Sequence, residues 1–527
     1  MPLRPSTRMI VAGFALLAVI PACTDVTTEP QSTVTSANIF NEATSYKAYL
    51  AKLYGGLAVS GQSGPAGNAD IQGIDEGFSQ YLRLYWQMEE LPTDEAVIAW
   101  NDAGVQELNT QIWGSSNQFL GAMYSRIFFQ VSLANEFLRQ TTDDKLAARG
   151  VTGQLLADVH QYRAEARFLR AYSYWHGIDL FGDIPLVKET DALTSTPPQQ
   201  STRAQVYAFI ESELNAIKGD LPPAGKAEYG RVDQGAVNML LATLYLNAAT
   251  YTGTAHNAEA LAAAQAVIAS GAYTLDPNYH HLFLADNNTS PEIIWAIGQD
   301  GKRTQSYGGT SFLIHASIGG SMDAKSEGMD GGWWGLRARQ ELVSLFPSPT
   351  ASPDKRALFY TQGQTTSVTD LLDFGKGLPS TKWQNVKSDG TPGSDPGFAD
   401  TDFPVFRLAE AYLIYAEATV RGGGGSRAQA VSYINALRQR AYGDASGNIS
   451  DSQLDLPFIL AERSRELYWE AKRRTDLIRF NTFSVNGVWQ WKGNILGGRP
   501  TTAIHDLFPL PATELVANPN LKQNAGY

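Results

Sequence analysis

The chain has 527 residues, of which 43% are hydrophobic and 18% are charged, so wholesale disorder is excluded. At about 150 residues per domain, the length indicates three or four domains or one large body built from repeats. The 41 Lys and Arg against 53 Asp and Glu give a net charge of −12. Such an acidic chain is a poor general binder of nucleic acid, and its charge will not hold it on an anionic membrane.

The N-terminus has the pattern of a secretory signal. Arg4 and Arg8 precede the apolar run 9–20, which is too short to span a bilayer. Ile20-Pro21-Ala22-Cys23 follows and is similar to a loose lipobox, in which the cysteine becomes the lipidated first residue. We therefore predict a lipoprotein signal peptide over 1–22 with lipidation at Cys23. The alternative is an ordinary secretory signal with Cys23 as a stray thiol.

Cys23 is the only cysteine, which excludes an intramolecular disulfide and a thiolate zinc cluster. Residues 23–36 are rich in Thr and Ser and are expected to form a flexible tether, with a reach of roughly 43 Å when fully extended. No later apolar run reaches 18 residues. We expect a single body over 37–527 that is attached to a membrane outside the cytoplasm through its lipid anchor only.

Helical apolar spacing recurs along this body. The predicted helices lie near 42–59, 117–140, 155–181, 204–218, 232–250, 257–270, 404–421, 426–441 and 456–473. Long polar and Gly-rich stretches separate them, and we expect loop-rich insertions around 60–115, 286–400 and 484–504. Loops of this length in a compact body are usually functional.

Two predicted helix pairs resemble each other. The pairs 236–270 and 406–441 each begin with a helix containing Leu-Ala-x-x-Tyr-Leu, at 241–246 and at 408–413. A small Ala beside large apolar residues lets two helices approach closely, and a period of about 34 residues is tetratricopeptide-like. Such pairs bury their apolar faces by stacking on their neighbours. The alternative is ordinary helix packing with chance similarity.

Sequence motifs for catalysis are mostly missing. The chain has no His-Glu-x-x-His, no phosphate-binding P-loop and no Gly-x-Ser-x-Gly. Paired carboxylates for glycoside hydrolysis stay open as an alternative, because an acidic chain offers many candidates. Asp323, Glu327 and Asp330 could bind Ca²⁺, but solvated loop acids are the simpler interpretation. We predict no cofactor and no metal.

Aromatic residues in the predicted loops point to ligand binding. Trp100 and Asn101 lie in polar surroundings, Tyr307 lies in Ser-Tyr-Gly-Gly, and Trp333-Trp334 is flanked by glycines. A large ring flanked by glycines has few local neighbours to bury it, and flat rings stack on sugar rings while amides bind hydroxyls. These five residues are our candidate ligand-binding set. The alternative is that the tryptophans only pack the loops onto the scaffold.

Two further segments could either bind a ligand or serve only the packing of the fold. Trp383 and Asn385 lie in the next long loop. Residues 462–481 alternate acidic and basic side chains, which could form a binding patch. The three Glu at i,i+4 spacing with interleaved Arg instead favour a lattice of ion pairs within and between helices.

Several strings along the chain carry a resemblance to a known family. They are 91–96, 111–113, 163–172, 179–186, 403–410, 415–418, 462–467, 476–479, 510–511 and 518–527. With these strings in this order, the chain resembles the SusD/RagB family of outer-membrane nutrient-uptake lipoproteins. The matching strings cover essentially the whole chain after the signal peptide.

The resemblance implies a mostly α fold: a right-handed superhelix of tetratricopeptide-like pairs with a large loop-rich half. It implies a non-catalytic protein on the cell surface that binds glycans or other nutrients. Its partner would be a SusC-like TonB-dependent barrel transporter in the outer membrane, to which it delivers the nutrient. An aromatic arc in the loops would hold the sugar, here on Trp100, Asn101, Tyr307, Trp333 and Trp334. The alternatives are a lipid-anchored glycan-cleaving enzyme and a scaffold whose repeats bind protein.

Overall fold

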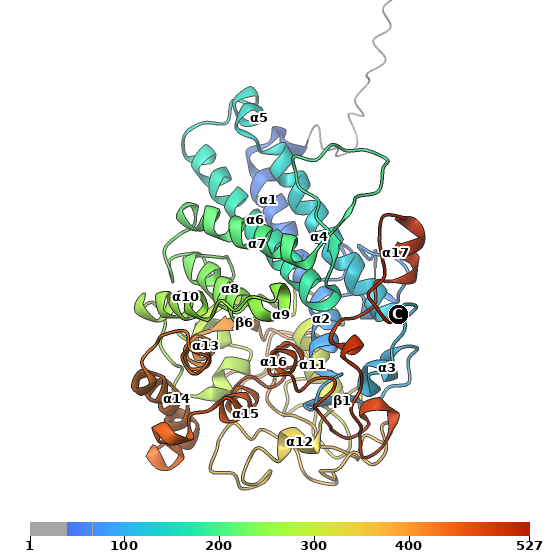
Figure 1. Ribbon diagram of the computed structural model, residues 1–527, viewed down its shortest axis with the longest axis vertical. Helices are drawn as coiled ribbons and strands as arrows, with labels where there is room; N and C mark the ends of the chain where they lie inside the picture. Colours follow the sequence, from blue (N-terminus) through green and yellow to red (C-terminus); the bar gives the residue numbers. More distant parts are fainter. Residues whose placement is uncertain (1–38, 66) are drawn as a thin grey trace, which may run out of the picture.

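The computed structural model describes residues 39–65 and 67–527 of the protein (Figure 1). The predicted signal peptide, the tether and Cys23 lie outside these residues. None of the described helices is both long and apolar enough to cross a bilayer. Most of the regular structure is helical, as predicted, and one set of buried side chains runs from Phe40 to Leu521.

All nine predicted helices are present. They are α1 (Ala43–Ala58), α4 (Gln118–Gln140), α6 (Gly153–Phe181), α7 (Arg203–Ile217), α8 (Gln234–Leu246), α10 (Asn257–Ala269), α13 (Leu408–Val420), α14 (Arg427–Tyr442) and α15 (Leu456–Leu467). The other α-helices are α2 (Tyr81–Glu90), α3 (Val105–Thr110), α5 (Asp143–Ala148), α9 (Ala248–Thr252), α11 (Gly309–Ser317), α12 (Gln340–Val343), α16 (Arg473–Arg479) and α17 (Ala512–Ala517).

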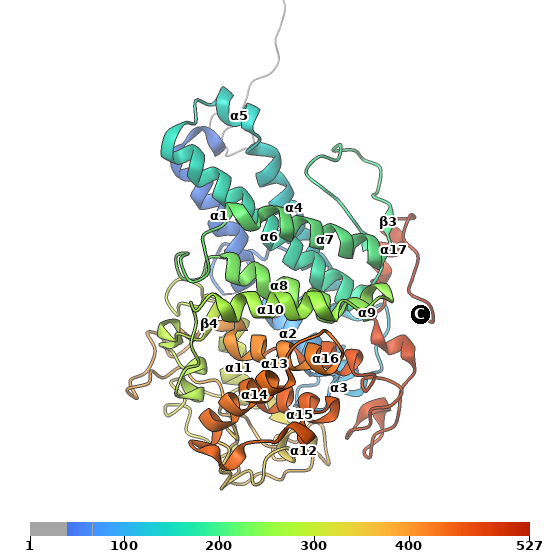
Figure 2. The ribbon, with the colours of Figure 1, turned by 60° about the vertical axis from the view of Figure 1, so that its left-hand side comes forward.

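The long helices stack in chain order. α4 packs on α6, α6 on α7, α8 on α10, α10 on α13, and α13 on α14. Figure 2 shows α7, α8, α10, α13 and α14 as successive layers down the molecule. Ala242, Ala264, Ala409 and Ala430 are fully buried between these helices. The small side chains therefore allow the close helix approach that the repeated pattern predicts.

The described residues form three two-stranded antiparallel sheets, two of them in the loop-rich half and one, β2–β3, between the scaffold helices α6 and α7. They pair β1 (Ala96–Ile98) with β5 (Leu336–Ala338), β2 (Ile184–Pro185) with β3 (Gln200–Ser201), and β4 (Ile293–Ile297) with β6 (Phe403–Arg407). The β4–β6 pair closes the insertion 298–402 at its base. The β1–β5 pair brings the segment after β1 beside the Gly-rich segment before β5. The predicted loop regions therefore meet at defined places.

The charged segment 462–481 forms a buried lattice of ion pairs rather than a binding patch. Glu466 is fully buried and pairs with Arg356, Arg407 and Arg440, which come from separate parts of the chain. The Arg407 Nη1 lies 2.6 Å from one Glu466 oxygen, and the Arg356 Nη1 lies 3.0 Å from the other. Burial alone would raise the pKa of Glu466, but these arginines hold that pKa far below its usual range.

The expectation of one helix through 456–473 is wrong in its last part, because α15 ends at Leu467. Trp469 and Ala471 take the left-handed conformation, with φ of 62° and 57°. The turn lets the Trp469 carbonyl accept a hydrogen bond from the Trp86 indole at 3.0 Å, and α16 then begins at Arg473. Contacts distant in sequence therefore override the local helical pattern.

Buried carboxyl groups hold the end of helix α2 against the turn before α16. Glu89 accepts hydrogen bonds from the Thr475 backbone and hydroxyl at 3.1 and 2.9 Å. Glu90 accepts one from the Lys472 backbone at 3.3 Å, and its other oxygen has no hydrogen-bond partner among the described residues. Burial, and then the nearby Glu95 and Glu89, raise the pKa of Glu90 well above its ordinary value of 4.5. The fold therefore favours the protonated form of the Glu90 carboxyl group.

We predict that this proton makes stability depend on pH. Above about pH 4.5 the unfolded chain loses the Glu90 proton while the folded chain keeps it, so the free energy of unfolding falls as pH rises toward the folded pKa. Glu90→Gln removes that contribution. The variant should be about 1–2 kcal/mol more stable than the native chain at pH 8 and nearly unchanged at pH 5. Unfolding measured at both pH values checks this.

Glu228→Gln is the matched control, because Glu228 is exposed on a surface loop. It should leave the pH dependence of unfolding as in the native chain. An equal pH dependence for Glu90→Gln and the native chain would show that Glu90 is ionised in the fold.

Candidate functional site

Three of the five predicted site residues come together. Trp100 follows β1, Trp333 precedes β5, and Tyr307 precedes α11. The ring centroids of Trp100 and Trp333 lie 6.3 Å apart, and those of Tyr307 and Trp333 lie 6.2 Å apart. Trp100 and Trp333 are half-buried, and Tyr307 is 37% exposed. The three residues, which we call the aromatic cluster, therefore present ring surface at one place.

Backbone pairing sets the position of the two tryptophans. The β1–β5 ladder continues with a hydrogen bond from the Ala99 amide to the Gly335 carbonyl at 2.9 Å. The Trp100 indole N–H then donates to the Trp333 carbonyl at 2.8 Å. Two segments more than 230 residues apart in the sequence are thereby held in register.

His315 of α11 fixes the Trp333 ring. Its carbonyl accepts a hydrogen bond from the Trp333 amide at 2.7 Å, and the two rings stack with centroids 4.5 Å apart and planes 6° apart. The His315 Nδ1 lies 2.7 Å from the Gly331 carbonyl oxygen. The Gly-rich loop is therefore a rigid support for the ring.

Gly335 is required by the close approach of Trp100. A Cβ atom at this position would lie 2.8 Å from Cε2 of the Trp100 ring, which is below van der Waals contact. In contrast, a Cβ atom at Gly331, four residues earlier, would meet no heavy atom within 4 Å. Packing therefore requires glycine at position 335, whereas position 331 has room for a side chain.

The other two predicted residues are placed differently. Trp334 is 53% exposed and packs beside Phe374, with centroids 5.7 Å apart. Its φ of 53° turns it away from the direction of its neighbour Trp333. Asn101 is exposed directly after Trp100. The structure therefore gathers Trp100, Trp333 and Tyr307 and leaves Trp334 at a separate position.

Polar and aromatic residues that were not predicted from the sequence lie beside the cluster. Phe78, Arg83 and Asp102 join Trp100 and Trp333 in lining an open hollow of about 350 Å³. The Arg83 guanidinium lies 5.4 Å from the Trp100 ring centroid, and its Nη1 donates to the Tyr307 carbonyl at 2.8 Å. Arg83 lies 224 residues from Tyr307 along the chain, so nothing local in the sequence marks this contact.

Arg83 is a positioning residue for the cluster. It is 3% exposed, and burial lowers the pKa of its guanidinium to about 9, so it stays charged at neutral pH. A buried cation beside aromatic faces attracts them electrostatically. Arg83 therefore helps to hold Trp100 and the Tyr307 backbone around the hollow.

The remaining loop candidates are structural. Trp383 is 2% exposed and stacks on Phe403, with centroids 5.3 Å apart. The buried Asn385 amide donates to the Gly328 and Asp395 carbonyls. Among residues 39–65 and 67–527, no group of three or more His, Cys, Asp or Glu could hold a metal ion, so the loop acids Asp323, Glu327 and Asp330 form no such group.

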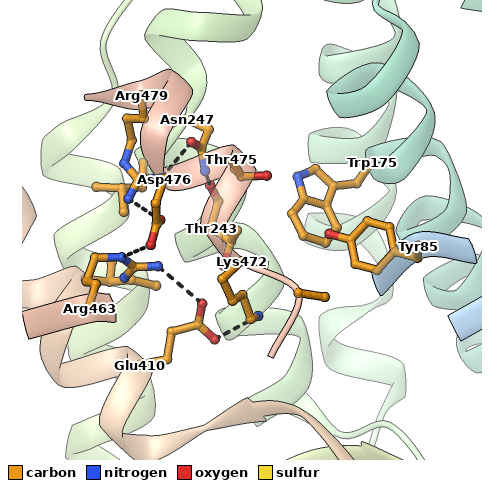
Figure 3. Close-up of a pocket in the computed structure, with 13 residues that line it drawn as sticks. Tyr85, Trp175, Thr243, Asn247, Glu410, Arg463, Lys472, Thr475, Asp476 and Arg479 are labelled. Atoms are coloured by element: carbon orange, nitrogen blue, oxygen red, sulfur yellow. Dashed lines mark hydrogen bonds and ion pairs between the residues drawn. The ribbon is translucent and has the colours of Figure 1, made fainter. Parts of the chain in front are cut away.

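A second, enclosed cavity lies where the helical repeats meet the C-terminal segment, and its volume of about 10 Å³ is roughly that of one water molecule (Figure 3). Its carboxylates are paired: Glu410 with Lys472 at 3.1 Å, and Asp476 with Arg463 at 2.7 Å. A cavity of this size with paired acids cannot take a sugar.

Comparisons with known proteins cover most of the chain. The family model described as "SusD family" matches residues 370–527, and one described as "Starch-binding associating with outer membrane" matches residues 80–246. The "Starch-binding protein SusD" of Bacteroides thetaiotaomicron is 36% identical, and the match covers 90% of this chain and 91% of that protein. The chain belongs to the SusD family.

Other SusD-like proteins agree with this assignment. "SusD-like protein P2" of Formosa agariphila is 28% identical over 80% of this chain and 83% of its own length. The solved structure of "Surface glycan-binding protein A" from Bacteroides fluxus has a TM-score of 0.70 at 20% identity, covering 92% of this chain and 99% of that one. The predicted mostly helical, SusD-like fold is confirmed.

Membership also bears on the choice between binding and catalysis. The relative from Bacteroides thetaiotaomicron is named for starch binding and the structure from Bacteroides fluxus for glycan binding, which agrees with the prediction of a non-catalytic SusD-family chain.

We predict that Gly335→Ala disrupts the aromatic cluster. The added methyl group must displace the Trp100 ring and break its hydrogen bond to Trp333. The free energy of unfolding should fall by about 1–3 kcal/mol, and the near-UV circular dichroism of the tryptophans should change. Gly331→Ala is the control and should leave both readouts as in the native chain. Equal spectra for the two variants would show that Trp100 has room to move.

Proposed function

We propose that this SusD-family chain is a cell-surface lipoprotein that binds glycans and delivers them to a SusC-like TonB-dependent outer-membrane transporter. The observation that carries the proposal is the meeting of Trp100, Trp333 and Tyr307 in one aromatic cluster, beside an open hollow that Trp100 and Trp333 line. Aromatic ring faces stack on the apolar C–H faces of sugars, and a few polar groups beside them fix orientation.

Each candidate residue has a role in this proposal. Trp100 and Trp333 supply stacking surface in the hollow, and Tyr307 adds ring surface beside Trp333. Asn101, which is exposed beside Trp100, supplies an amide for sugar hydroxyls. Trp334 supplies a separate exposed ring, which a longer chain would reach after the cluster.

The lining of the hollow supports binding without cleavage. Glycoside hydrolysis uses a pair of carboxyl groups on either side of the bond that is cleaved. Of the five residues that line the hollow, Asp102 is the one carboxylate. An α-glucan of the starch type is the first ligand to test, because the 36% identical relative is named for starch binding.

The N-terminal sequence supports the membrane part of the proposal. With 1–22 as a signal peptide, Cys23 as the lipidated residue and 23–36 as a tether, the body 37–527 would hang on the outer membrane. Two or three acyl chains hold a protein firmly on a bilayer. A tethered body that closes over a barrel would keep captured glycan at high effective concentration at the entrance.

We predict that Trp333→Ala weakens glycan binding. Loss of the central ring of the cluster should reduce affinity for maltoheptaose at least tenfold, equivalent to about 1.4 kcal/mol. Calorimetry with the purified chain measures this, and a thermal melt confirms that the variant is folded. Trp334→Ala should have a smaller effect on this short ligand.

Val516→Ala is the control, because Val516 is 87% exposed on α17 and is not among the residues of the hollow. A folded Trp333→Ala variant with native affinity would rule out this site. Failure of the native chain to bind starch-type and laminarin-type glycans would contradict glycan binding.

We predict that Cys23→Ser releases the chain from the membrane. The native chain should fractionate with outer membranes and co-purify, after mild detergent extraction, with a barrel protein of roughly twice its mass. The variant, which has no thiol to lipidate, should appear in the soluble fraction. Membrane retention of the variant would refute the lipid anchor, and a native chain that purifies alone would count against the transporter.

A further inference from the structure

Tyr229 is an exposed aromatic residue outside the aromatic cluster. Its side chain is 46% exposed, on the loop between α7 and α8. Its hydroxyl donates to Oδ2 of Asp402 at 2.7 Å. Asp402 is 5% exposed and also accepts a hydrogen bond from the Gln299 amide at 2.6 Å. The outer edge of an exposed ring is therefore fixed to a buried carboxyl group.

The backbone that carries Tyr229 is fixed as well. The next residue, Gly230, accepts a hydrogen bond from the Trp295 indole at 3.1 Å. Arg231 then makes two hydrogen bonds to the fully buried Glu165 of α6. An exposed ring that is anchored at both ends loses little conformational entropy when a ligand covers it.

Two hollows meet at Tyr229. One has a volume of about 330 Å³ and a mainly apolar lining, with Leu50, Tyr54 and Ala58 of α1 on one wall and Trp295 of β4 on the other. α1 and β4 contact each other on the same side of the molecule (Figure 2). The other hollow, of about 800 Å³, has mixed polar and apolar surface, and its polar lining residues include Asn288, Asp300, Lys302, Thr304, Ser394 and Asp400.

This combination matches the chemistry of a sugar chain. Each ring of an oligosaccharide has apolar C–H faces and a polar edge of hydroxyl groups. The apolar hollow and the Tyr229 ring offer surface to the faces, while the neighbouring carboxylate, amide and hydroxyl groups suit the edges. Asp300, Asp400 and Asp402 face Lys302 and Arg303 here, and Lys302 is already paired with Asp395 at 2.7 Å. The two hollows together are lined by four acidic and four basic side chains, so neither sign of charge is in excess and a neutral sugar fits: Glu228, Asp300, Asp400 and Asp402 against Lys47, Arg231, Lys302 and Arg303.

Two segments of the chain connect the hollow of about 800 Å³ with the aromatic cluster. Thr304 lines both hollows at Tyr229, and Tyr307 of the cluster follows three residues later, at most about 11 Å away along the chain. On the other wall, Ser394 and Asp400 flank Phe398, whose ring lies 5.7 Å from that of Tyr307. The segments 298–307 and 394–402 thus contribute to both places.

We propose that Tyr229 and the hollows on either side of it form a second binding site for a neutral oligosaccharide. The proposal rests on the glycan-binding function proposed above. The two sites together bind one long glycan more tightly than either alone, because the second contact is made within the complex.

Calorimetry on the full chain tests this with maltotriose, maltoheptaose and soluble starch as probes. The native chain should bind two maltotrioses. Tyr229→Ala should bind only one maltotriose, at the aromatic cluster, which is the site that Trp333→Ala removes. Tyr229→Ala should also weaken the apparent affinity for starch about tenfold. Tyr229→Phe keeps the ring and loses the hydroxyl, so it should retain starch affinity to within about twofold. A thermal melt checks the folding of each variant.

The outcomes separate the two proposals. One maltotriose per native chain, lost in Trp333→Ala and unchanged in both Tyr229 variants, overturns the second site and leaves the proposed function standing. No binding of these probes or of laminarin by the native chain overturns the proposed function itself. Retention of the second site in folded Tyr229→Ala shows that the ring is not the platform.

Discussion

The arrangement of β6, α14, α15 and the long insertion depends on one constraint, which is the meeting of three arginines at the Glu466 carboxylate. Arg407 comes from β6, Arg440 from α14, and Arg356 from the long insertion. Removing one partner leaves an uncompensated buried charge, which costs about 3–5 kcal/mol. The strand, the helix and the insertion must therefore assemble together around α15, because the absence of any one of them would leave a buried charge without its partner. The intact lattice adds little to net stability, since paired burial of charge roughly offsets its own desolvation.

This constraint reaches the ligand site through the strands. Arg407 ends β6, whose partner β4 closes the base of the insertion that carries Tyr307 and Trp333. At the other side, the buried acids at the end of α2 meet the turn before α16, and Arg83 of the same helix contacts the Tyr307 carbonyl. The aromatic rings lie on loops, yet every loop is tied to an element that the ion pairs hold in place. A binding surface made of irregular chain is in this way as rigid as its scaffold.

The scaffold helices could be predicted from the sequence because they are long, from 12 residues in α15 to 29 in α6, so apolar residues recur over several turns. Helices α2 and α11 were not predicted because they have only ten and nine residues, too few turns for the period to be recognised. Three aromatic residues of the site were found from their glycine-rich or polar surroundings. Trp334 shares the surroundings of Trp333, and only its left-handed backbone separates the two. Arg83 and Tyr229 depend on partners 224 and 173 residues away, which no local pattern records.

The Trp100 indole has a consequence for the kind of selectivity that this surface can achieve. Its N–H group is already bonded to the Trp333 carbonyl, so the ring has no donor left with which to read an individual hydroxyl. The rings of the cluster are inclined to one another: the planes of Trp100 and Trp333 by 46°, and those of Tyr307 and Trp333 by 66°. A straight, ribbon-like polymer that lies flat on one of these rings cannot also stack on the next, because the two planes are inclined. On the function proposed above, a chain that coils would meet successive rings as it turns, so the inclined rings would favour a curved glycan while Asn101 and the other polar groups beside them would contact its hydroxyls.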